Sequence, residues 1–303
     1  MNMRIVPALV LVSALSGAPM AAQPTMPTTY QAVLTTLGRA GDFKDGVLKV
    51  NLPRTDLKVT INGRAVPTGL GFGGWIALTD GEQGMSVMMG DLVLTEDQVN
   101  PVMSAILDNG LEATALHNHF FWETPRIFYM HVHGHGSPAD LAKRVKPALD
   151  LTMRSVTPPA APAASASAAP SAAAAPGIDG AALAKIIGTV GEQNGAVYKI
   201  TIGRADLAVK EMGAVINARM GLNTWAAFTG TDDDAVVAGD VAMLGSEVTP
   251  VLTAMRKAGL SVVSLHHHMI GTQPEIYFLH YWGQGTATTL AGGVKSAIAL
   301  LGT

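Results

Sequence analysis

All nine histidines of the chain lie in two short segments. The first segment, "LHNHFFWETPRIFYMHVHGHG" at 116–136, contains His117, His119, His131, His133 and His135. The second, "LHHHMIGTQPEIYFLHYW" at 265–282, contains His266, His267, His268 and His280. Neutral imidazoles are common ligands of divalent transition metals, and three of them bind Zn while leaving a fourth position open. The pattern therefore predicts a divalent transition-metal site, with Zn as the favoured ion and Cu as an alternative.

The two segments are copies of one sequence. Residues 149 positions apart correspond, as in His117 with His266, His119 with His268 and His131 with His280. The match extends to "GD" at 90–91 and 239–240 and, with one more residue of offset, to "RTDLKV" at 54–59 and "RADLAV" at 204–209. A period near 150 residues is far too long for a solenoid, so the chain reads as two copies of one domain.

Each histidine segment is predicted to form two neighbouring strands. In repeat 1 these are 111–120 and 126–133, and their short connection favours an antiparallel hairpin. Side chains two residues apart on a strand share a face, so a register that places His117 or His119 opposite His131 brings four imidazoles together. Leu116, Phe120, Phe128, Met130 and Val132 are then expected on the opposite, apolar face. Small residues at Ala113 and Ala115 suggest a shallow pocket on the histidine face.

Other elements must position this hairpin. In repeat 1 helices are predicted at 29–37, 96–109 and from 137 to about 149, and strands at 46–52, 75–78 and 86–94, with a hairpin turn at Asn62-Gly63. Repeat 2 has the same plan, with helices at 251–257 and 289–301 and strands at 260–268 and 276–282. The expected fold is α+β, with a mostly antiparallel sheet and flanking helices in each of two homologous domains.

Seven histidines are candidate metal ligands, because each lies on a predicted strand face that the two strands of its hairpin share. They are His117, His119, His131, His133, His266, His268 and His280. Repeat 1 carries Glu123 and His133 where repeat 2 carries Thr272 and Trp282. We therefore expect the tighter site in repeat 1, with Glu123 as the candidate catalytic base if that site activates water. One composite site at the interface of the two repeats, or two equivalent sites, are the alternatives.

The sequence leaves three function classes open. The first is a metal-binding or carrier protein with one His-x-His plus His site in each repeat. The second is a metal-dependent enzyme, similar to a hydrolase, that uses the repeat-1 site. The third is a ligand-binding module that uses a histidine-lined pocket without metal. The expected partner is accordingly a metal ion or a small molecule, and the sequence carries no signal for an oligomeric state.

Composition restricts the classes of partner and indicates where the protein is located. The net charge of −3 offers no basic surface for nucleic acid. The chain has no cysteine, so any metal must be held by His, Asp, Glu, Met or water. Residues 1–22 contain one arginine, an apolar run and small residues, as a secretory signal peptide does, and no later stretch is predicted to span a membrane. The predicted location is the periplasm or the exterior of the cell.

Composition also marks the boundary between the repeats. Residues 154–177 consist largely of Ala, Pro and Ser, which cannot supply a core, and read as an extended linker. The predicted repeat domains are 28–153 and 178–303.

The two repeats resemble the LppY/LpqO family of exported bacterial proteins. The resemblance rests on the Gly-Asp strand, the Leu-His-x-His motif and the Pro-x-Ile-x-x-x-His strand, found at 90–136 and again at 239–285. The family is built around a domain of unknown function, so the resemblance implies export and no particular activity. Named members are lipoproteins, whereas this chain lacks the cysteine that a lipid anchor requires.

Overall fold

The computed structural model describes residues 25–152 and 177–302. The predicted signal peptide at 1–22 and nearly all of the predicted linker at 154–177 lie outside these ranges. The two described parts correspond to the two repeats. None of the helices in these two parts is long and apolar enough to cross a membrane.

Repeat 1 contains three long helices and a six-stranded sheet. The helices are α1 (Thr28–Leu37), α2 (Glu96–Asp108) and α3 (Pro138–Thr152). The sheet strands are β1 (Asp42–Lys44), β2 (Val47–Pro53), β5 (Gly73–Asp80), β6 (Ser86–Thr95), β7 (Glu112–His117) and β9 (Ile127–Gly136). A small outlying sheet is formed by β3 (Val59–Ile61), β4 (Arg64–Val66) and β8 (Glu123–Thr124), and two short 3₁₀ helices are η1 (Thr68–Leu70) and η2 (Glu82–Gly84).

Repeat 2 follows the same plan. Its helices are α4 (Gly180–Ile187), α5 (Gly245–Lys257) and α6 (Ala287–Ile298), with the 3₁₀ helix η3 (Ala218–Met220). Its sheet strands are β10 (Glu192–Asn194), β11 (Val197–Gly203), β14 (Asn223–Gly230), β15 (Ala235–Leu244), β16 (Ser261–His266) and β17 (Ile276–Gly285). A separate hairpin pairs β12 (Lys210–Glu211) with β13 (Ala214–Val215).

Both sheets are antiparallel throughout and share one strand order. The order is β1-β2-β5-β6-β9-β7 in repeat 1 and β10-β11-β14-β15-β17-β16 in repeat 2. The predicted α+β fold with two homologous domains is confirmed. The histidine-bearing strands β9 and β17 lie inside their sheets, while β7 and β16 form sheet edges.

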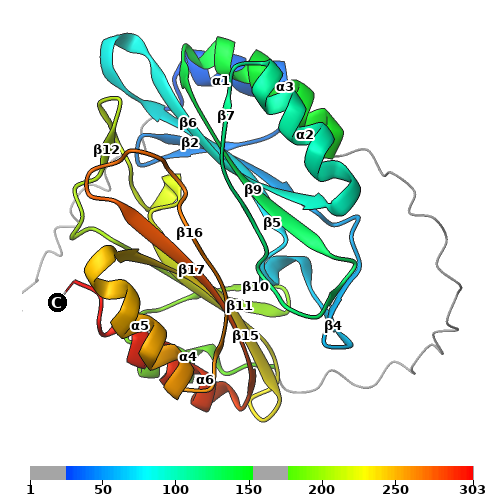
Figure 1. Ribbon diagram of the computed structural model, residues 1–303, viewed down its shortest axis with the longest axis vertical. Coiled ribbons are helices and arrows are strands. Elements are labelled where there is room, and N and C mark those ends of the chain that lie inside the picture. Colours follow the sequence, from blue (N-terminus) through cyan, green and yellow to red (C-terminus); the bar gives the residue numbers. More distant parts are fainter. Residues whose placement is uncertain (1–24, 153–176, 303) are drawn as a thin grey trace, which may run out of the picture.

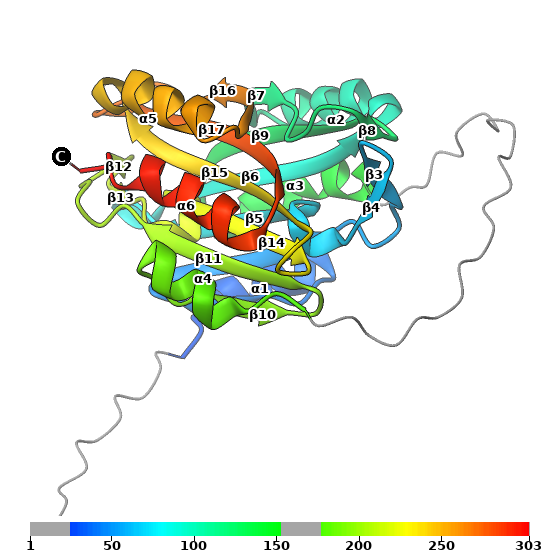
Figure 2. The ribbon, with the colours of Figure 1, turned by 90° about the horizontal axis from the view of Figure 1, so that it is seen from below.

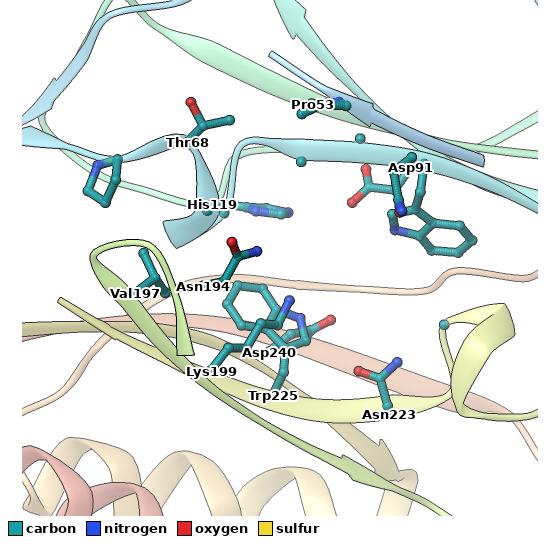
Figure 3. Close-up of a pocket in the computed structure, with 18 of the residues that line it drawn as sticks. Pro53, Thr68, Asp91, His119, Asn194, Val197, Lys199, Asn223, Trp225 and Asp240 are labelled. Atoms are coloured by element: carbon teal, nitrogen blue, oxygen red, sulfur yellow. The ribbon is translucent and has the colours of Figure 1, made fainter. Parts of the chain in front are cut away.

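The two sheets face each other between two layers of helices. Figure 1 shows α1, α2 and α3 on the outer side of the first sheet and α4, α5 and α6 on the outer side of the second, and Figure 2 shows the same layers after a quarter turn. The inner face of each sheet is therefore covered by the other repeat. A cavity remains between the two inner faces, with residues of both repeats on its walls (Figure 3).

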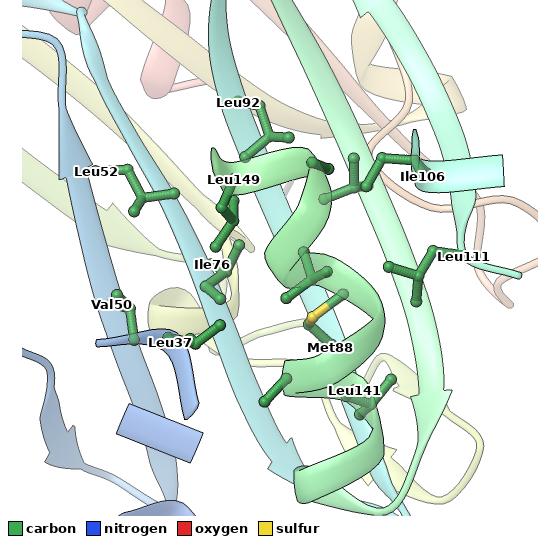
Figure 4. Close-up of a cluster of buried hydrophobic side chains, with 14 of the residues drawn as sticks. Leu37, Val50, Leu52, Ile76, Met88, Leu92, Ile106, Leu111, Leu141 and Leu149 are labelled. Atoms are coloured by element: carbon green, nitrogen blue, oxygen red, sulfur yellow. The ribbon is translucent and has the colours of Figure 1, made fainter. Parts of the chain in front are cut away.

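Each repeat has its own core between its sheet and its helices. In repeat 1, Leu37, Ile106 and Leu149 of the helices pack on Ile76 and Met88 of the sheet (Figure 4). Repeat 2 has an equivalent cluster. The amphipathic periodicity of the helices explains this face, because apolar residues three or four positions apart lie on one side of a helix.

Two further apolar clusters join the repeats. One contains Val47 and Met89 of repeat 1 together with Met220 and Phe278 of repeat 2. The other contains side chains from both repeats as well: Phe72, Phe120, Tyr129, Ala238 and Trp282 are among them. These clusters explain why β6 and β15 are buried along nearly their whole length, since both faces of each strand are covered.

Several local predictions are confirmed with shifted boundaries. Asn62 and Gly63 both have positive φ, 50° and 76°, as a two-residue hairpin turn requires. Thr95 precedes α2 and forms a capping box with Gln98. The predicted strand at 111–120 is shorter than expected, because β7 ends at His117, and the strand predicted at 126–133 continues to Gly136.

A buried arginine in each repeat provides a matched pair for a stability test. Arg54 donates to Val93 O at 2.6 Å and to Gln98 Oε1 at 2.9 Å. Arg204 donates to Ala242 O at 2.6 Å and to Glu247 Oε2 at 2.8 Å. Burial raises the pKa of Glu247, but hydrogen bonds from Arg204, Gly302 N and Leu244 N together outweigh this effect and hold that pKa below its usual value.

We expect Arg204→Met to destabilise the protein more than Arg54→Met does. Loss of Arg204 leaves the buried Glu247 carboxylate without its cation and with only the backbone donors Leu244 N and Gly302 N, which costs about 3–5 kcal/mol. Loss of Arg54 removes hydrogen bonds to the neutral Val93 O and Gln98 Oε1, which costs about 1–3 kcal/mol. Urea unfolding of the two variants measures the difference. Adding Glu247→Gln to Arg204→Met should recover part of the loss, and equal losses in the two single variants would contradict the argument.

Candidate metal centre

The histidine-bearing strands pair in a register that differs from the predicted ones. Ala115 lies opposite His131 and His117 lies opposite Tyr129, with a bulge between Ala113 and Ala115. Repeat 2 has the same register and the same bulge. His117 and His131 nevertheless share a face, because the register differs from a predicted one by two residues and faces repeat every two residues.

Two other details of the predicted hairpin are wrong. Leu116 is 43% exposed, because β7 is an edge strand. Phe120 lies beyond the end of β7 and packs with Trp282 in an apolar cluster that joins the two repeats. The expected shallow pocket with an alanine floor also does not form. Ala113 packs against the helix-side core of repeat 1, and the histidines are covered by the other repeat.

Histidines of the two repeats meet in one cluster. Ring centroids lie 3.8 Å apart for His117 and His266, and 3.6 Å apart for His119 and His280. The rings of His131 and His268 are 3.9 Å apart. Each of these pairs joins one repeat to the other. The structure thus differs from the expectation of one separate site on each hairpin, and we call these six histidines the inter-repeat histidine cluster.

Hydrogen bonds hold the backbones of the two repeats together beside this cluster. Thr114 Oγ1 donates to His268 O at 2.7 Å, and Ser264 Oγ donates to Asn118 O at 3.0 Å. The two bonds run in opposite directions between the repeats, one donated by repeat 1 and one by repeat 2. They fix the loops that carry His119 and His268, both of which follow the ends of their strands.

Three overlapping sets of side chains bring potential ligand atoms within 4.8 Å of one another. The sets are His117 with His131 and His266, His117 with His119 and His280, and Asp240 with His266 and His280. The first two sets contain residues of both repeats. The five imidazoles and one carboxylate of these sets are the nitrogen and oxygen ligands that Zn and related ions accept.

Most of these imidazoles have a buried ring nitrogen with no hydrogen-bond partner in the described parts of the chain. The unpartnered nitrogens include Nε2 of His131, His266, His268 and His280 and Nδ1 of His117, His119 and His268. The other nitrogen is often held by the backbone, since Nδ1 of His280 lies 3.2 Å from Gly239 O and Nδ1 of His266 lies 3.3 Å from His267 O. Such outer hydrogen bonds orient an imidazole and leave its other nitrogen free to bind a metal.

The cluster favours neutral imidazoles. Burial lowers the pKa of His117, His119, His131, His268 and His280, and neighbouring histidines lower most of these values further. Burial also lowers the pKa of His266, to about 4. A neutral imidazole is the form that coordinates a metal, so no proton has to be displaced from these groups at neutral pH.

Two buried aspartates complete the cluster. Asp91 on β6 lies opposite His131, and Asp240 on β15 lies opposite His280. Asp240 Oδ2 is 3.7 Å from His268 Nε2, and Asp91 Oδ1 has no hydrogen-bond partner in the described residues. Burial raises the pKa of Asp91 to about 7, and burial together with the charge of Asp91 raises the pKa of Asp240 to about 8.

Aspartate after glycine is common in turns and caps, but both aspartates lie in mid-strand. The signal that identifies them is the repeat itself, because Gly90-Asp91 and Gly239-Asp240 recur at the same spacing from the histidines.

Other residues singled out in the sequence lie away from the cluster. His133 Nε2 is 2.8 Å from a carboxylate oxygen of Glu211, and its Nδ1 is 3.5 Å from one of Glu112. Burial lowers the pKa of His133, but these two acids outweigh burial and raise it overall. Trp282, at the equivalent position of repeat 2, packs edge-on against Phe120.

Glu123 lies at the outlying sheet. Its Oε1 accepts a hydrogen bond from Ile127 N at 3.0 Å, and it belongs to none of the three ligand sets. Burial raises its pKa to about 7. His135 is exposed, and the ring of His267 packs on Tyr277, as expected for residues outside a metal site.

The cavity between the repeats has a volume of about 640 Å³ and opens onto the cluster. His119, His268, His280, Asp91 and Asp240 are among its lining residues. Figure 3 shows Asp91 and His119 on the side of repeat 1, facing Asp240, Lys199 and Trp225 on the side of repeat 2. A small molecule in the cavity would therefore reach the cluster.

Lysine and tryptophan pairs form opposite walls of the cavity. Lys49 Nζ lies 4.4 Å from the ring centroid of Trp75, and Lys199 Nζ lies 4.3 Å from that of Trp225. Burial and the charges of Lys199 and Arg219 lower the pKa of Lys49 to about 8, and burial lowers that of Lys199. The lysines belong to no sequence motif that marks a site, although they correspond at the offset of 150 that also relates the tryptophans.

Comparison with known proteins gives a family without an assigned activity. No curated protein matches the chain. Among solved structures, it is similar to the trimeric bacterial microcompartment shell protein PduB, with 15% identity, 86% of this chain and 92% of that chain covered and a TM-score of 0.21. It is also similar to EtuB from Clostridium kluyveri, with 10% identity, coverage of 86% and 90%, respectively, and a TM-score of 0.20. At these TM-scores neither likeness bears on function.

A family description does match, and it matches twice. Residues 31–151 and 181–300 each fit the family described as a domain of unknown function (DUF1259). The two matched regions coincide with the two α+β repeats that the structure shows. The chain therefore belongs to this family and contains two tandem copies of its domain.

Proposed function

We propose that the protein binds a divalent transition metal, with Zn favoured, in one composite site between its two repeats. The ligands are drawn from the inter-repeat histidine cluster and from Asp91 and Asp240. The observation that carries the proposal is the set of buried ring nitrogens that face one another across the interface without hydrogen-bond partners. Buried polar atoms are rarely left unpaired in folded proteins, and each such atom costs about 1–3 kcal/mol.

The spacing of the nitrogens fits a small ion. Tetrahedral ligands at about 2.1 Å from Zn are roughly 3.4 Å from one another. The Nε2 atoms of His117 and His119 are 3.2 Å apart. The remaining ligand atoms of each set lie within 4.8 Å, a spacing that small rotations of the imidazoles would close.

A hydrogen-bonded histidine network without metal is the main alternative. Such a network would pair the ring nitrogens with one another or with the aspartates. Among the six clustered histidines of the described chain, His117 and His119 are the pair joined by a nitrogen–nitrogen contact of hydrogen-bond length. Asp240 Oδ2 is 3.7 Å from His268 Nε2 and 4.0 Å from His280 Nε2, too far for hydrogen bonds. The arrangement supports a metal better than it supports a network.

A metal-dependent enzyme is a second candidate, favoured by the cavity that reaches His119, His268 and His280. A metal with an open coordination position lowers the pKa of bound water and polarises an attached oxygen. Asp91 and Asp240 line the cavity and could accept a proton there, whereas the proposed role of Glu123 as the base requires a proton path from the outlying sheet. Glu123→Gln separates the two, because it should leave turnover intact if an aspartate is the base.

We also propose that the protein is exported through the signal peptide at 1–22 and acts in the periplasm or outside the cell. The apolar run near the N-terminus and the resemblance to the LppY/LpqO family support this location. Fractionation of the native host measures the location of the protein, and an uncleaved chain in the cytoplasm would contradict the proposed export.

Metal analysis of tag-free protein tests the proposed function. We expect at least one equivalent of zinc per chain after purification or after reconstitution of chelator-treated protein. Saturating zinc at about 1,000 times its Kd should stabilise the fold by about 4 kcal/mol. His135→Ala and His267→Ala are matched controls that remove an imidazole outside the cluster and should change neither result. A tag-free protein that neither retains nor takes up Zn, Cu, Ni, Fe or Mn would refute the proposal.

A further inference from the structure

The walls of the inter-repeat cavity carry two ammonium groups that the proposed metal site does not use. Lys49 stands on β2 and Lys199 on β11, at equivalent positions of the two repeats. Within 25–152 and 177–302, neither ammonium group forms an ion pair with a carboxylate. Lys49 Nζ lies 3.4 Å from Arg219 O, and each lysine also lies over a tryptophan ring.

The acids of the cavity do not form ion pairs with these lysines. Asp91 and Asp240 line the same cavity, opposite His131 and His280 in their strand registers, and among the described residues no ion pair joins either carboxylate to a lysine. Two like charges that face one cavity repel each other, and a partly buried ammonium group without an anion is costly. The tryptophan faces offset only part of this cost, since a cation–π contact is weaker than a charge-assisted hydrogen bond to an anion.

At the wall of the cavity, a glycine of each repeat lies against the tryptophan of the other repeat. A Cβ at Gly221 of repeat 2 would lie 3.0 Å from the Trp75 ring of repeat 1. A Cβ at Gly71 of repeat 1 would lie 3.8 Å from the Trp225 ring of repeat 2. Gly221 has φ +98°, which a residue with a side chain rarely adopts. The glycine loop of each repeat thus packs close to the tryptophan of the other repeat at the cavity wall.

We propose that this cavity binds a small organic dianion with two carboxylates. Each carboxylate pairs with one lysine, and the carbon chain lies between the two tryptophan rings. The volume of about 640 Å³ suits a small molecule of this kind. Asn51, Asn223 and Thr68 also line the cavity and offer hydrogen bonds to carboxylate oxygens. This inference goes beyond metal binding, because the lysines bind the dianion whether or not the histidine cluster holds an ion.

Calorimetric titration with succinate tests the proposal on the full mature chain, both metal-free and zinc-loaded. We expect succinate to bind both forms, and acetate and 1,4-butanediol to bind at least about tenfold more weakly, since each charge-assisted contact contributes about 1.5–3 kcal/mol. Lys49→Met and Lys199→Met should each weaken succinate binding by about tenfold or more. Lys185→Met removes an exposed lysine from α4 and should leave binding unchanged.

Two further measurements keep the outcome unambiguous. Lys49→Arg retains the charge and should bind succinate within a few-fold of the unsubstituted protein, which separates a lost charge from a damaged fold. Zinc stoichiometry is measured for every variant and should not change in the lysine variants. Undetectable succinate binding, equal binding of acetate and succinate, or full binding by both methionine variants would overturn the dianion site. A protein that binds succinate through the lysines but takes up no metal would leave this inference standing and refute only the metal site.

Discussion

Replacing His266 and His268 with alanine should remove strong zinc binding as completely as replacing His117 and His119. Each double substitution breaks two of the three ligand sets: the first breaks the two that contain His266, and the second breaks the two that contain His117. Loss of an outer hydrogen bond alone typically weakens a metal site by 10–100-fold, and loss of two ligands should exceed about 100-fold. Competition with a zinc chelator of known affinity measures the change.

This expectation reverses the one drawn from the sequence, in which repeat 1 held the tighter site. That interpretation rested on His133 and Glu123, which have no counterparts in repeat 2. In the structure His133 pairs with Glu112 and Glu211, and Glu123 lies at the outlying sheet. The double variant His135→Ala/His267→Ala is the control, since it removes one imidazole from each repeat outside the cluster. A loss confined to the His117/His119 variant would restore a separate site in repeat 1.

The sequence predicted the elements and the faces of the histidine strands, but it did not predict that the two faces meet. Strand faces follow from a local rule, the alternation of side chains along an extended chain. His117 and His131 therefore shared a face even though the predicted register was wrong. The bulge between Ala113 and Ala115 has no signature in residue type, so the register itself was not readable.

The meeting of the faces depends on contacts between residues about 150 positions apart. One signal for it was present. The segment "SVMMGDLVLT" at 86–95 is apolar almost throughout rather than alternating, as is typical of a strand covered on both faces. Helices of the same repeat cover one face of this strand, so its other face must pack against a second domain. The second repeat is the one that the chain itself supplies.

Asp91 and Asp240 show why repeated polar residues within an apolar strand are informative. A carboxyl in the middle of such a strand costs stability unless it has a partner. Two copies at equivalent positions indicate that the cost is offset by function. The same reasoning applies to Lys49 and Lys199, whose correspondence becomes meaningful once both are seen to face one cavity.

The buried carboxyls should also make metal-free protein lose stability as pH rises. The folded pKa values of about 7 for Asp91 and about 8 for Asp240 exceed the value near 3.9 of an unfolded chain. Between pH about 4 and 8 the folded state therefore binds more protons than the unfolded state, so the free energy of unfolding falls with pH. The clustered histidines have the opposite effect, because the unfolded chain binds protons on them around and below pH 6.5 and the folded chain does not. They therefore make the free energy of unfolding rise with pH in that range.

Between pH 6.5 and 8.5 the two aspartates alone are expected to remove about 3 kcal/mol of stability from the metal-free protein, which the histidines and the lowered pKa of Lys49 partly offset. Urea unfolding at a series of pH values measures this. Relative to the unsubstituted protein, Asp91→Asn/Asp240→Asn should gain about that much stability across this range, while Asp108→Asn, an exposed control on α2, should not. Zinc should stabilise the protein more as the pH rises, because an aspartate that binds the ion must release its proton and metal affinity then rises with pH. A double variant with the same pH profile as the unsubstituted protein would show that the two aspartates are not the source of the stored cost that metal binding relieves.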